Sequence, residues 1–238
     1  MNSKLYSISY IDLLLAFIPV AITLILFIIW SLELKRTLLA LLRMVIQLLT
    51  IGYCLTFIFN AQNSFIVLLI LVVMIVTSSW ISLGSLQKDR LKYLKASLIS
   101  IFLGGGITLA IITQIVLRLD PWFDPRYMVP LAGMIFANCM NSISLAIDRF
   151  TNEIELGKTY IEARNTAYRT SLLPVTNSLL AVGLVSIPGM MTGQILSGVD
   201  PLIASRYQMI VMCMVFGSAG ISSACLLRLC KNHTSSNT

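Results

Sequence analysis

The sequence predicts an all-α, polytopic membrane protein with seven transmembrane helices, an external N-terminus and a cytoplasmic C-terminus. Hydrophobic residues make up 57% of the chain of 238 residues and charged residues 11%, about half the charged share of a soluble domain. Seven long apolar runs fill the chain, and a helix needs about 20 apolar residues to cross the hydrocarbon layer. The loops between the runs contain, in alternation, few and many basic residues.

Each run is expected to be a helix, because lipid offers no water to backbone polar groups and a helix satisfies them within the segment. The first run is too long for the apolar part of a signal peptide and no small-residue cleavage site follows it, so we expect it to be retained. We place the spans at residues 12–30, 38–59, 64–83, 97–117, 128–147, 171–196 and 206–227.

No soluble domain fits between these runs, so residues 1–238 form one membrane-spanning domain. The longest polar stretch, residues 148–170, joins the fifth and sixth spans. A short tail, residues 228–238, follows the last span, and we expect it to be disordered from residue 231 because it is polar and terminal.

Basic residues in the loops set the orientation, because cytoplasmic loops carry an excess of Lys and Arg. Four lie on one side: Lys4, Arg118, Arg126 and Arg206. Twelve lie on the other side: Lys35, Arg36, Lys88, Arg90, Lys92, Lys95, Arg149, Lys158, Arg164, Arg169, Arg228 and Lys231. This excess puts residues 148–170 and the C-terminus in the cytoplasm. The net charge of +7 belongs to these topogenic loops, so no nucleic-acid partner is expected.

Several observations argue against chemistry carried by the chain itself. Gly157-Lys158-Thr159 matches the end of a phosphate-binding loop, but Asn152 stands where that loop needs glycine and no strand precedes it. The single histidine, His233, lies in the tail, which excludes a histidine-based catalytic or metal site. The carboxylates lie in loops or near span ends, whereas a proton-driven carrier usually needs one inside the membrane. We therefore expect no enzyme and no bound cofactor; transport is either passive or driven by another protein.

Polar residues inside the spans have two interpretations. Asn138 and Asn141, with two neighbouring serines, give the fifth span a polar stripe that either bonds other helices, at about 1 kcal/mol or less, or lines a substrate path. Gln47 lies one turn from Arg43 in the second span, and we interpret Arg43 as a side chain that snorkels to the surface. The eleven methionines either fill gaps in apolar packing or contact a soft metal. The five cysteines show no paired spacing and are expected to be packed thiols.

Proline and glycine predict a break in the sixth span. Pro188 has no backbone donor and should interrupt the helix, and Gly189 and Gly193 follow at the spacing of a close helix contact. Broken helices at membrane depth line binding sites or gates in transporters, although a simple kink is the alternative. Other glycines predicted to allow close helix approach are Gly104, Gly105, Gly106, Gly217 and Gly220.

Residues 154–172 have apolar positions at intervals of three and four, which predicts an amphipathic helix within residues 155–170 that leads into the sixth span. One interpretation is a helix that lies on lipid headgroups. The other is a docking element for a soluble subunit. The pattern favours neither.

These residues resemble the signatures of the FetB family of ABC-transporter permeases, which also includes plant aluminium-tolerance permeases. The resemblance is carried by GLVSIPGMMTGQIL at 183–196 with Ser197 and Gly198-Val199-Asp200-Pro201, PLAGM at 130–134, Asn138 with Met140-Asn141, Asp148-Arg149, and Glu162-Ala163 with Arg169 and Leu173-Pro174. The last group is similar to the EAA coupling loop of ABC permeases. Ala137 departs from the glycine expected before the asparagine, and the coupling segment is a few residues shorter than expected.

The resemblance implies a permease of the bacterial inner membrane that works as two copies with two cytosolic ATPase subunits, which hydrolyse the ATP. Bacterial relatives are linked to iron export and plant relatives to nucleotide-sugar or aluminium handling, so the cargo is expected to be a metal ion, such as iron, or a small solute. On this basis docking is expected at Glu162, Ala163, Arg169 and Pro174. A gate is expected at Pro188, Gly189, Met190, Met191, Thr192 and Gly193, and a path lined by Asn138, Asn141 and Gln47.

Two alternatives remain at this point. A passive channel or facilitator is compatible with the broken span and the polar stripe. In a membrane scaffold without transport, the same glycines and asparagines would only pack helices.

Overall fold

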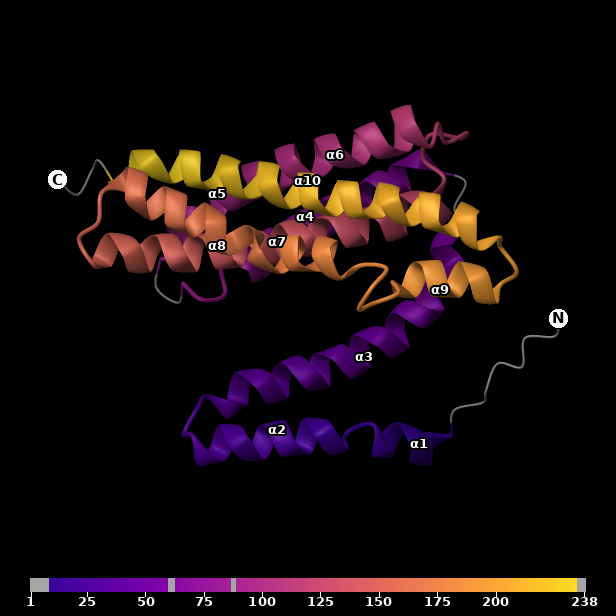
Figure 1. Ribbon diagram of the computed structural model, residues 1–238, viewed down its shortest axis with the longest axis horizontal. Coiled ribbons are helices and arrows are strands. Elements are labelled where there is room, and N and C mark those ends of the chain that lie inside the picture. The colour runs from indigo at the N-terminus through magenta and orange to yellow at the C-terminus, as the bar shows by residue number, and fades with distance from the viewer. Residues whose placement is uncertain (1–8, 60–62, 87–88, 235–238) are drawn as a thin grey trace. The chain divides into compact units, whose positions relative to one another are not determined.

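The computed structural model describes residues 9–59, 63–86 and 89–234. The chain forms two compact units, Met1–Asn60 and Ala61–Thr238 (Figure 1). Of the predicted features, Lys4, Lys88 and residues 235–238 lie outside the described residues.

The first unit is a helical hairpin with an interrupted first arm. α1 (Tyr10–Leu15) begins at Ser9, whose backbone N–H donates to the Asp12 carboxylate at 3.0 Å. α2 (Ile18–Ile29) follows after two residues, and Pro19 lies in its first turn, where proline is tolerated. α3 (Leu34–Phe59) is one continuous helix. The predicted first span is therefore two helices, and packing within the unit buries no residue of α2.

The second unit is a bundle in which α7, α8 and α10 lie side by side (Figure 1). In chain order its helices are α4 (Ser64–Ser82), α5 (Arg90–Ile101), α6 (Ile107–Ala110), α7 (Pro125–Glu155), α8 (Tyr160–Ala181), α9 (Gly189–Leu196) and α10 (Pro201–Thr234). Two π-helical stretches, Phe102–Gly106 and Ile111–Val116, flank α6, so that Arg90–Val116 is a single long helix.

Gly104 lets this long helix approach α10 closely. A Cβ atom at Gly104 would lie 2.6 Å from the backbone nitrogen of Ser222, and one at Gly105 would lie 2.8 Å from the ring of Phe136. The predicted close approach is confirmed at these two glycines. At Gly106 and Gly217 nothing lies within 4 Å of a Cβ position. The prediction of close helix approach is therefore wrong for these two glycines within a single chain.

α7 and α10 are the longest helices of the described part. α7 has 31 residues and α10 has 34, about 46 and 51 Å at about 1.5 Å per residue. A hydrocarbon layer is about 30 Å thick, so both helices extend beyond it. The core between them is apolar and fully buried at Phe136, Ile143, Ile147, Phe150 and Met214.

Two predictions about the elements need correction, and a third stays open. Six helices of the described residues are long and apolar enough to cross a membrane. The sixth predicted span, residues 171–196, divides into α8 and α9, so a seventh crossing stays a prediction. Residues 155–170 do not form a separate helix: α7 continues to Glu155, and α8 starts at Tyr160 and runs on to Ala181. The tail is helical as far as Thr234, where α10 ends.

Candidate functional site

The polar segment at residues 148–170 is a tight helical hairpin. α7 ends at Glu155, and Gly157 then adopts φ +79°, a conformation that side chains disfavour. Thr159 starts α8 as its N-cap. The turn contains only four residues between two long helices, and this is short enough to place them side by side.

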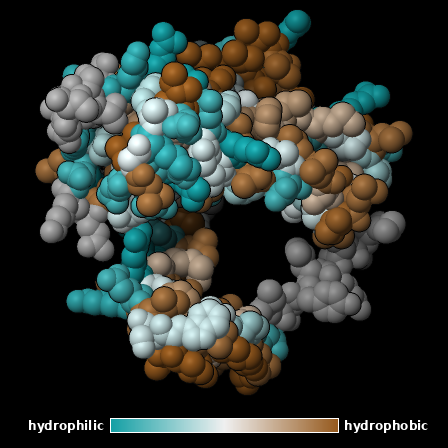
Figure 2. Space-filling view, turned by 60° about the vertical axis from the view of Figure 1, so that its left-hand side comes forward, coloured by the Kyte–Doolittle hydropathy of each residue, from teal (hydrophilic) through white to brown (hydrophobic). Residues whose placement is uncertain are grey.

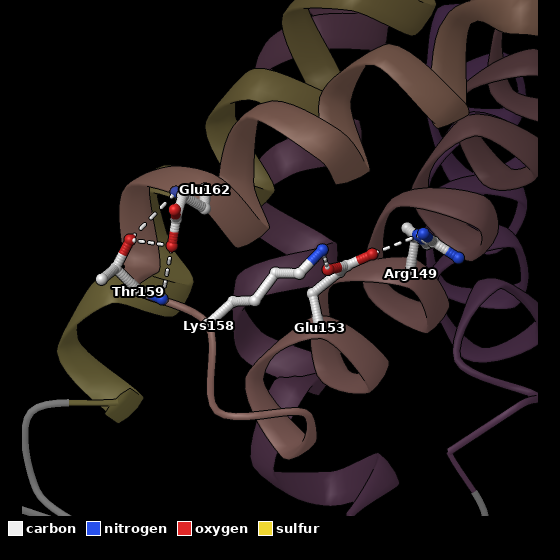
Figure 3. A network of polar contacts seen from close by, with 5 residues as sticks. All are labelled: Arg149, Glu153, Lys158, Thr159 and Glu162. Carbon is white, nitrogen blue, oxygen red and sulfur yellow. Dashed lines mark hydrogen bonds and ion pairs between the residues drawn. The ribbon is translucent and has the colours of Figure 1, made fainter.

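A buried carboxylate fixes this turn. Glu153 lies in the last turn of α7 with its side chain only 1% exposed, and it pairs with Arg149 and Lys158 at 2.5 Å each. Arg149 is one helical turn earlier, whereas Lys158 belongs to the turn and reaches back to the helix (Figure 3). The two cations are 47% and 46% exposed. Glu153 therefore ties the turn to α7.

A capping box fixes the start of α8. The Glu162 carboxylate accepts hydrogen bonds from the Thr159 hydroxyl at 2.7 Å and from the Thr159 backbone N–H at 3.1 Å, while the Thr159 hydroxyl accepts from the Glu162 N–H (Figure 3). These bonds from Thr159, with a smaller contribution from the charge of Lys158, hold the pKa of Glu162 below its usual value. Glu162, predicted for docking, thus also organises the helix start.

The other predicted docking residues have different environments. Ala163 is fully buried inside the second unit, and its contact with a docked subunit would be indirect. Arg169 is exposed on α8. Pro174 is 14 positions beyond Tyr160, about 21 Å along the helix, and lines an internal cavity instead of the hairpin.

The hairpin is also joined to α10. The Tyr160 hydroxyl donates to the Leu227 carbonyl at 2.9 Å, and the Tyr160 ring meets Phe150 edge to face. Hydrophilic side chains gather over this end of the second unit in the space-filling view (Figure 2). Two apolar side chains at the tip are exposed nonetheless, Leu156 by 75% and Ile161 by 61%.

The predicted polar stripe of α7 faces a small cavity. Asn138, Asn141 and Ser142 line it from α7, Ser171 and Pro174 from α8, and its volume is about 100 Å³. Asn138 donates to the Met134 carbonyl at 2.8 Å. Because Pro174 has no N–H, the Thr170 carbonyl lacks its helical donor. The asparagine and serine side chains of the lining make the cavity polar, and it is large enough for water.

Gln47, the third residue predicted for the path, belongs to the first unit. It lies exposed on α3, one turn from Arg43. Its part in a path stays a prediction.

The helix is interrupted in the region where the break is predicted, and the interruption is longer than a kink at Pro188. α8 ends at Ala181, Gly183 adopts φ +82°, and α9 begins after Pro188 as its N-cap. The Gly183 N–H donates to the Ser186 carbonyl at 2.9 Å, which closes a small loop. Leu184 on this loop is 89% exposed.

A larger cavity lies beside the predicted gate. Its volume is about 510 Å³, and α7, α9 and α10 contribute Arg126, Tyr127, Met134, Met190, Gln194 and Tyr207. The Gln194 Oε1 atom is buried and has no hydrogen-bond partner among the described residues. Of the six predicted gate residues, Met190 faces this cavity. Gly189, Thr192 and Gly193 are exposed, and Pro188 and Met191 are half-buried.

Within the described ranges, no group of three His, Cys, Asp or Glu side chains could hold a metal ion. Met134 and Met190 share the large cavity, so soft contact with a metal cargo stays a prediction for these two.

Sequence reasoning missed Glu153, Tyr160 and Gln194. The sequence does indicate that Glu153 is buried. It lies seven residues after Ala146 and three after Phe150, which places it on the buried face of α7. A carboxylate on an apolar face needs a partner. Tyr160 lies in the apolar pattern of residues 154–172 and Gln194 in the motif at 183–196, but neither pattern shows that their surroundings include α10.

Comparisons with known proteins agree with this architecture. The model of a family described as "Uncharacterised protein family (UPF0014)" matches residues 10–166 and 156–234. The "Probable iron export permease protein FetB" of Escherichia coli is 33% identical over 214 residues, 81% of this chain and 80% of the relative. "Protein ALUMINUM SENSITIVE 3" of Arabidopsis thaliana is 34% identical over 204 residues, 79% of this chain and 73% of the relative.

A bacterial relative, "UPF0014 membrane protein slr1647" of Synechocystis, is 33% identical over 188 residues, 73% of each chain. No solved structure matches the chain. The long apolar helices, the broken sixth span and these matches together show that the chain belongs to the UPF0014 family of multi-pass membrane proteins.

Proposed function

We propose that this protein is the membrane-spanning permease subunit of an ABC transporter that exports a metal ion, such as iron, or a small solute. A separate cytosolic ATPase supplies the energy, and two copies of the chain work with two ATPase subunits. The E. coli relative is named as a probable iron export permease, which supports the substrate class. The absence of a phosphate-binding loop in this sequence supports a separate ATPase.

The observation that carries the proposal is the fixed α7–α8 hairpin with exposed apolar side chains at its tip. Leu156 and Ile161 are exposed beside a turn that the Glu153 ion pairs and the Glu162 capping box hold in one conformation. A preorganised apolar anchor with a charged rim is typical of a docking surface, because little conformational freedom is lost on binding.

Force on such a tip would reach the membrane interior through α8. This helix is continuous from Tyr160 to Ala181, passes the polar cavity at Ser171 and Pro174, and ends at the break before α9. Closure of an ATPase pair would therefore move one continuous helix, and the break would absorb the movement as a hinge.

Docking can be tested with a charged substitution at the tip. The tagged protein and its Leu156→Asp/Ile161→Asp variant are purified from membranes of the native host, and co-purified chains are searched for a Walker motif. We expect such an ATPase with the wild type and at least about a tenfold lower yield with the variant, as for loss of an interface anchor. The Leu91→Asp variant is the control, since Leu91 is an exposed leucine in the first turn of α5, among basic residues that are predicted to be cytoplasmic. Equal yields from the wild type and the tip variant would reject docking at the hairpin.

A passive facilitator is the second candidate, and the broken helix beside a cavity of about 510 Å³ favours it. The two candidates differ in their energy requirement. Metal flux through the purified chain in proteoliposomes without ATP or partner would support the facilitator. Flux that appears only with the ATPase and ATP would support the transporter.

A further inference from the structure

A continuous groove runs between α8 and α10. It consists of two hollows of about 620 and 590 Å³ that share Tyr168, Ala224 and Arg228. The hydrogen bond from the Tyr160 hydroxyl to the Leu227 carbonyl fixes the two helices beside one end of the groove. The same two helices lie together at the hairpin end in Figure 1.

The groove is apolar at one end, over about the depth of one lipid leaflet. α10 lines this part from Phe216 to Cys225, with Gly217 and Gly220 between them. Nine residue steps of helix cover about 14 Å, and half of a hydrocarbon layer is about 15 Å. An acyl chain that follows α10 would match this length.

The other end of the groove is cationic. Arg164 from α8 and Arg228 and Lys231 from α10 line it together with the amide of Asn165. None of the described residues that line either hollow carries a carboxylate. Arg228 and Lys231 lie three and six residues after Cys225 on α10, so the positive charge lies where a headgroup would follow its chain.

We propose that this groove binds an anionic glycerophospholipid, with an acyl chain against Gly217 and Gly220 and the phosphate between Arg164, Arg228 and Lys231. Basic pockets between transmembrane helices bind such headgroups. A free phosphate would leave the apolar part of the groove empty. A second copy packed here about a two-fold axis would bring the same cations together. The proposal is independent of any ATPase.

The test is native mass spectrometry of the full-length protein in detergent, with phosphatidylglycerol or phosphatidylcholine of identical acyl chains. Each basic residue near a headgroup gives about a fivefold preference for anionic lipid. The wild type should therefore retain phosphatidylglycerol preferentially. The Arg228→Gln/Lys231→Gln variant should lose about 25-fold of that preference.

Two further variants separate headgroup, chain and general charge effects. Gly217→Leu adds a side chain to the apolar part, at a position where nothing lies within 4 Å of a Cβ atom, and it should reduce phosphatidylglycerol retention severalfold. Lys35→Gln/Arg36→Gln removes two cations from α3 of the first unit and should leave retention unchanged. Unchanged melting temperatures show that the variants are folded.

Four results would overturn the proposal. One is equal retention of the two lipids by the wild type. Another is a loss of phosphatidylglycerol preference in the Arg228→Gln/Lys231→Gln variant that is no larger than in the control pair. The third is displacement of phosphatidylglycerol by millimolar inorganic phosphate alone, which would indicate a phosphate site. The fourth is a dimer that Gly217→Leu dissociates while lipid retention stays the same, which would indicate that a second copy occupies the groove.

Discussion

Glu153 shows how one side chain can set the geometry of a hairpin. Its carboxylate is buried, yet both of its partners are about half exposed, so the arrangement is neither a surface ion pair nor a fully buried one. The free-energy cost of burying the charge is offset by two ion pairs, one within α7 and one to the turn. Removal of the charge leaves two cations that water can still reach.

We predict that Glu153→Gln lowers the melting temperature of the protein, by less than the loss of one partner from an ion pair with both partners buried. The loss arises because the neutral amide of glutamine cannot balance the positive charges of Arg149 and Lys158 as the carboxylate does. Thermal unfolding in detergent measures the change. Glu155→Gln, two residues later and exposed, is the matched control and should be neutral. Equal stability of both variants would show that the Glu153 ion pairs contribute nothing.

Glu162 gives the start of α8 a pH dependence. Hydrogen bonds from Thr159 lower the pKa of Glu162 in the folded state, so its contribution is present above the usual value of 4.5 and is lost as pH falls through the lower folded value. We expect amides at residues 160–163 to exchange faster in Glu162→Ala than in the wild type at pH 7. The difference should shrink below about pH 4. Hydrogen exchange measured on both proteins at each pH checks this, and a pH-independent difference would contradict it.

At the scale of elements, the approach of the long helix Arg90–Val116 to α10 depends on the missing side chain at Gly104. We predict that Gly104→Ala lowers stability by about 1–3 kcal/mol, since its Cβ would overlap the backbone of α10 and overpacking costs about that much. Gly106→Ala, where nothing lies within 4 Å, should be neutral or slightly stabilising. Unfolding midpoints of the two variants provide the comparison, and similar midpoints would mean that the helices separate freely at Gly104.

The break between α8 and α9 shows what a sequence pattern can and cannot locate. Pro188 predicts an interruption, because proline cannot donate to the helical ladder, and Pro188 indeed caps α9. The other end of the break, at Ala181, depends on Gly183 and on the bond from Gly183 to Ser186. A glycine in an apolar run has no unique meaning, so only the proline end could be predicted.

For the whole molecule, hydropathy predicts where the chain crosses the membrane, because lipid imposes one rule on every span. It does not predict that Pro174 shares a cavity with Asn138 and Asn141, or that Lys158 reaches back to Glu153. Those contacts join residues from different helices or across a turn, and neither periodicity nor composition encodes them. The first unit is also separate in its packing, although its spans resemble the others in composition.

Topology is a property of the whole molecule and rests on the distribution of basic residues, twelve against four. The loop with Trp122 precedes α7, and the hairpin with Leu156 follows it. A helix of about 46 Å puts these two ends on opposite faces of the membrane.

We predict that, in a background without native cysteines, Leu156→Cys reacts with an impermeant maleimide only after the cells are opened, whereas Trp122→Cys reacts in intact cells. Ile143→Cys, fully buried in the core, should stay unlabelled and controls for non-specific entry. Labelling of position 156 in intact cells would put the hairpin outside the cell, beyond the reach of any cytosolic ATPase, while the lipid groove between α8 and α10 would remain possible in the outer leaflet.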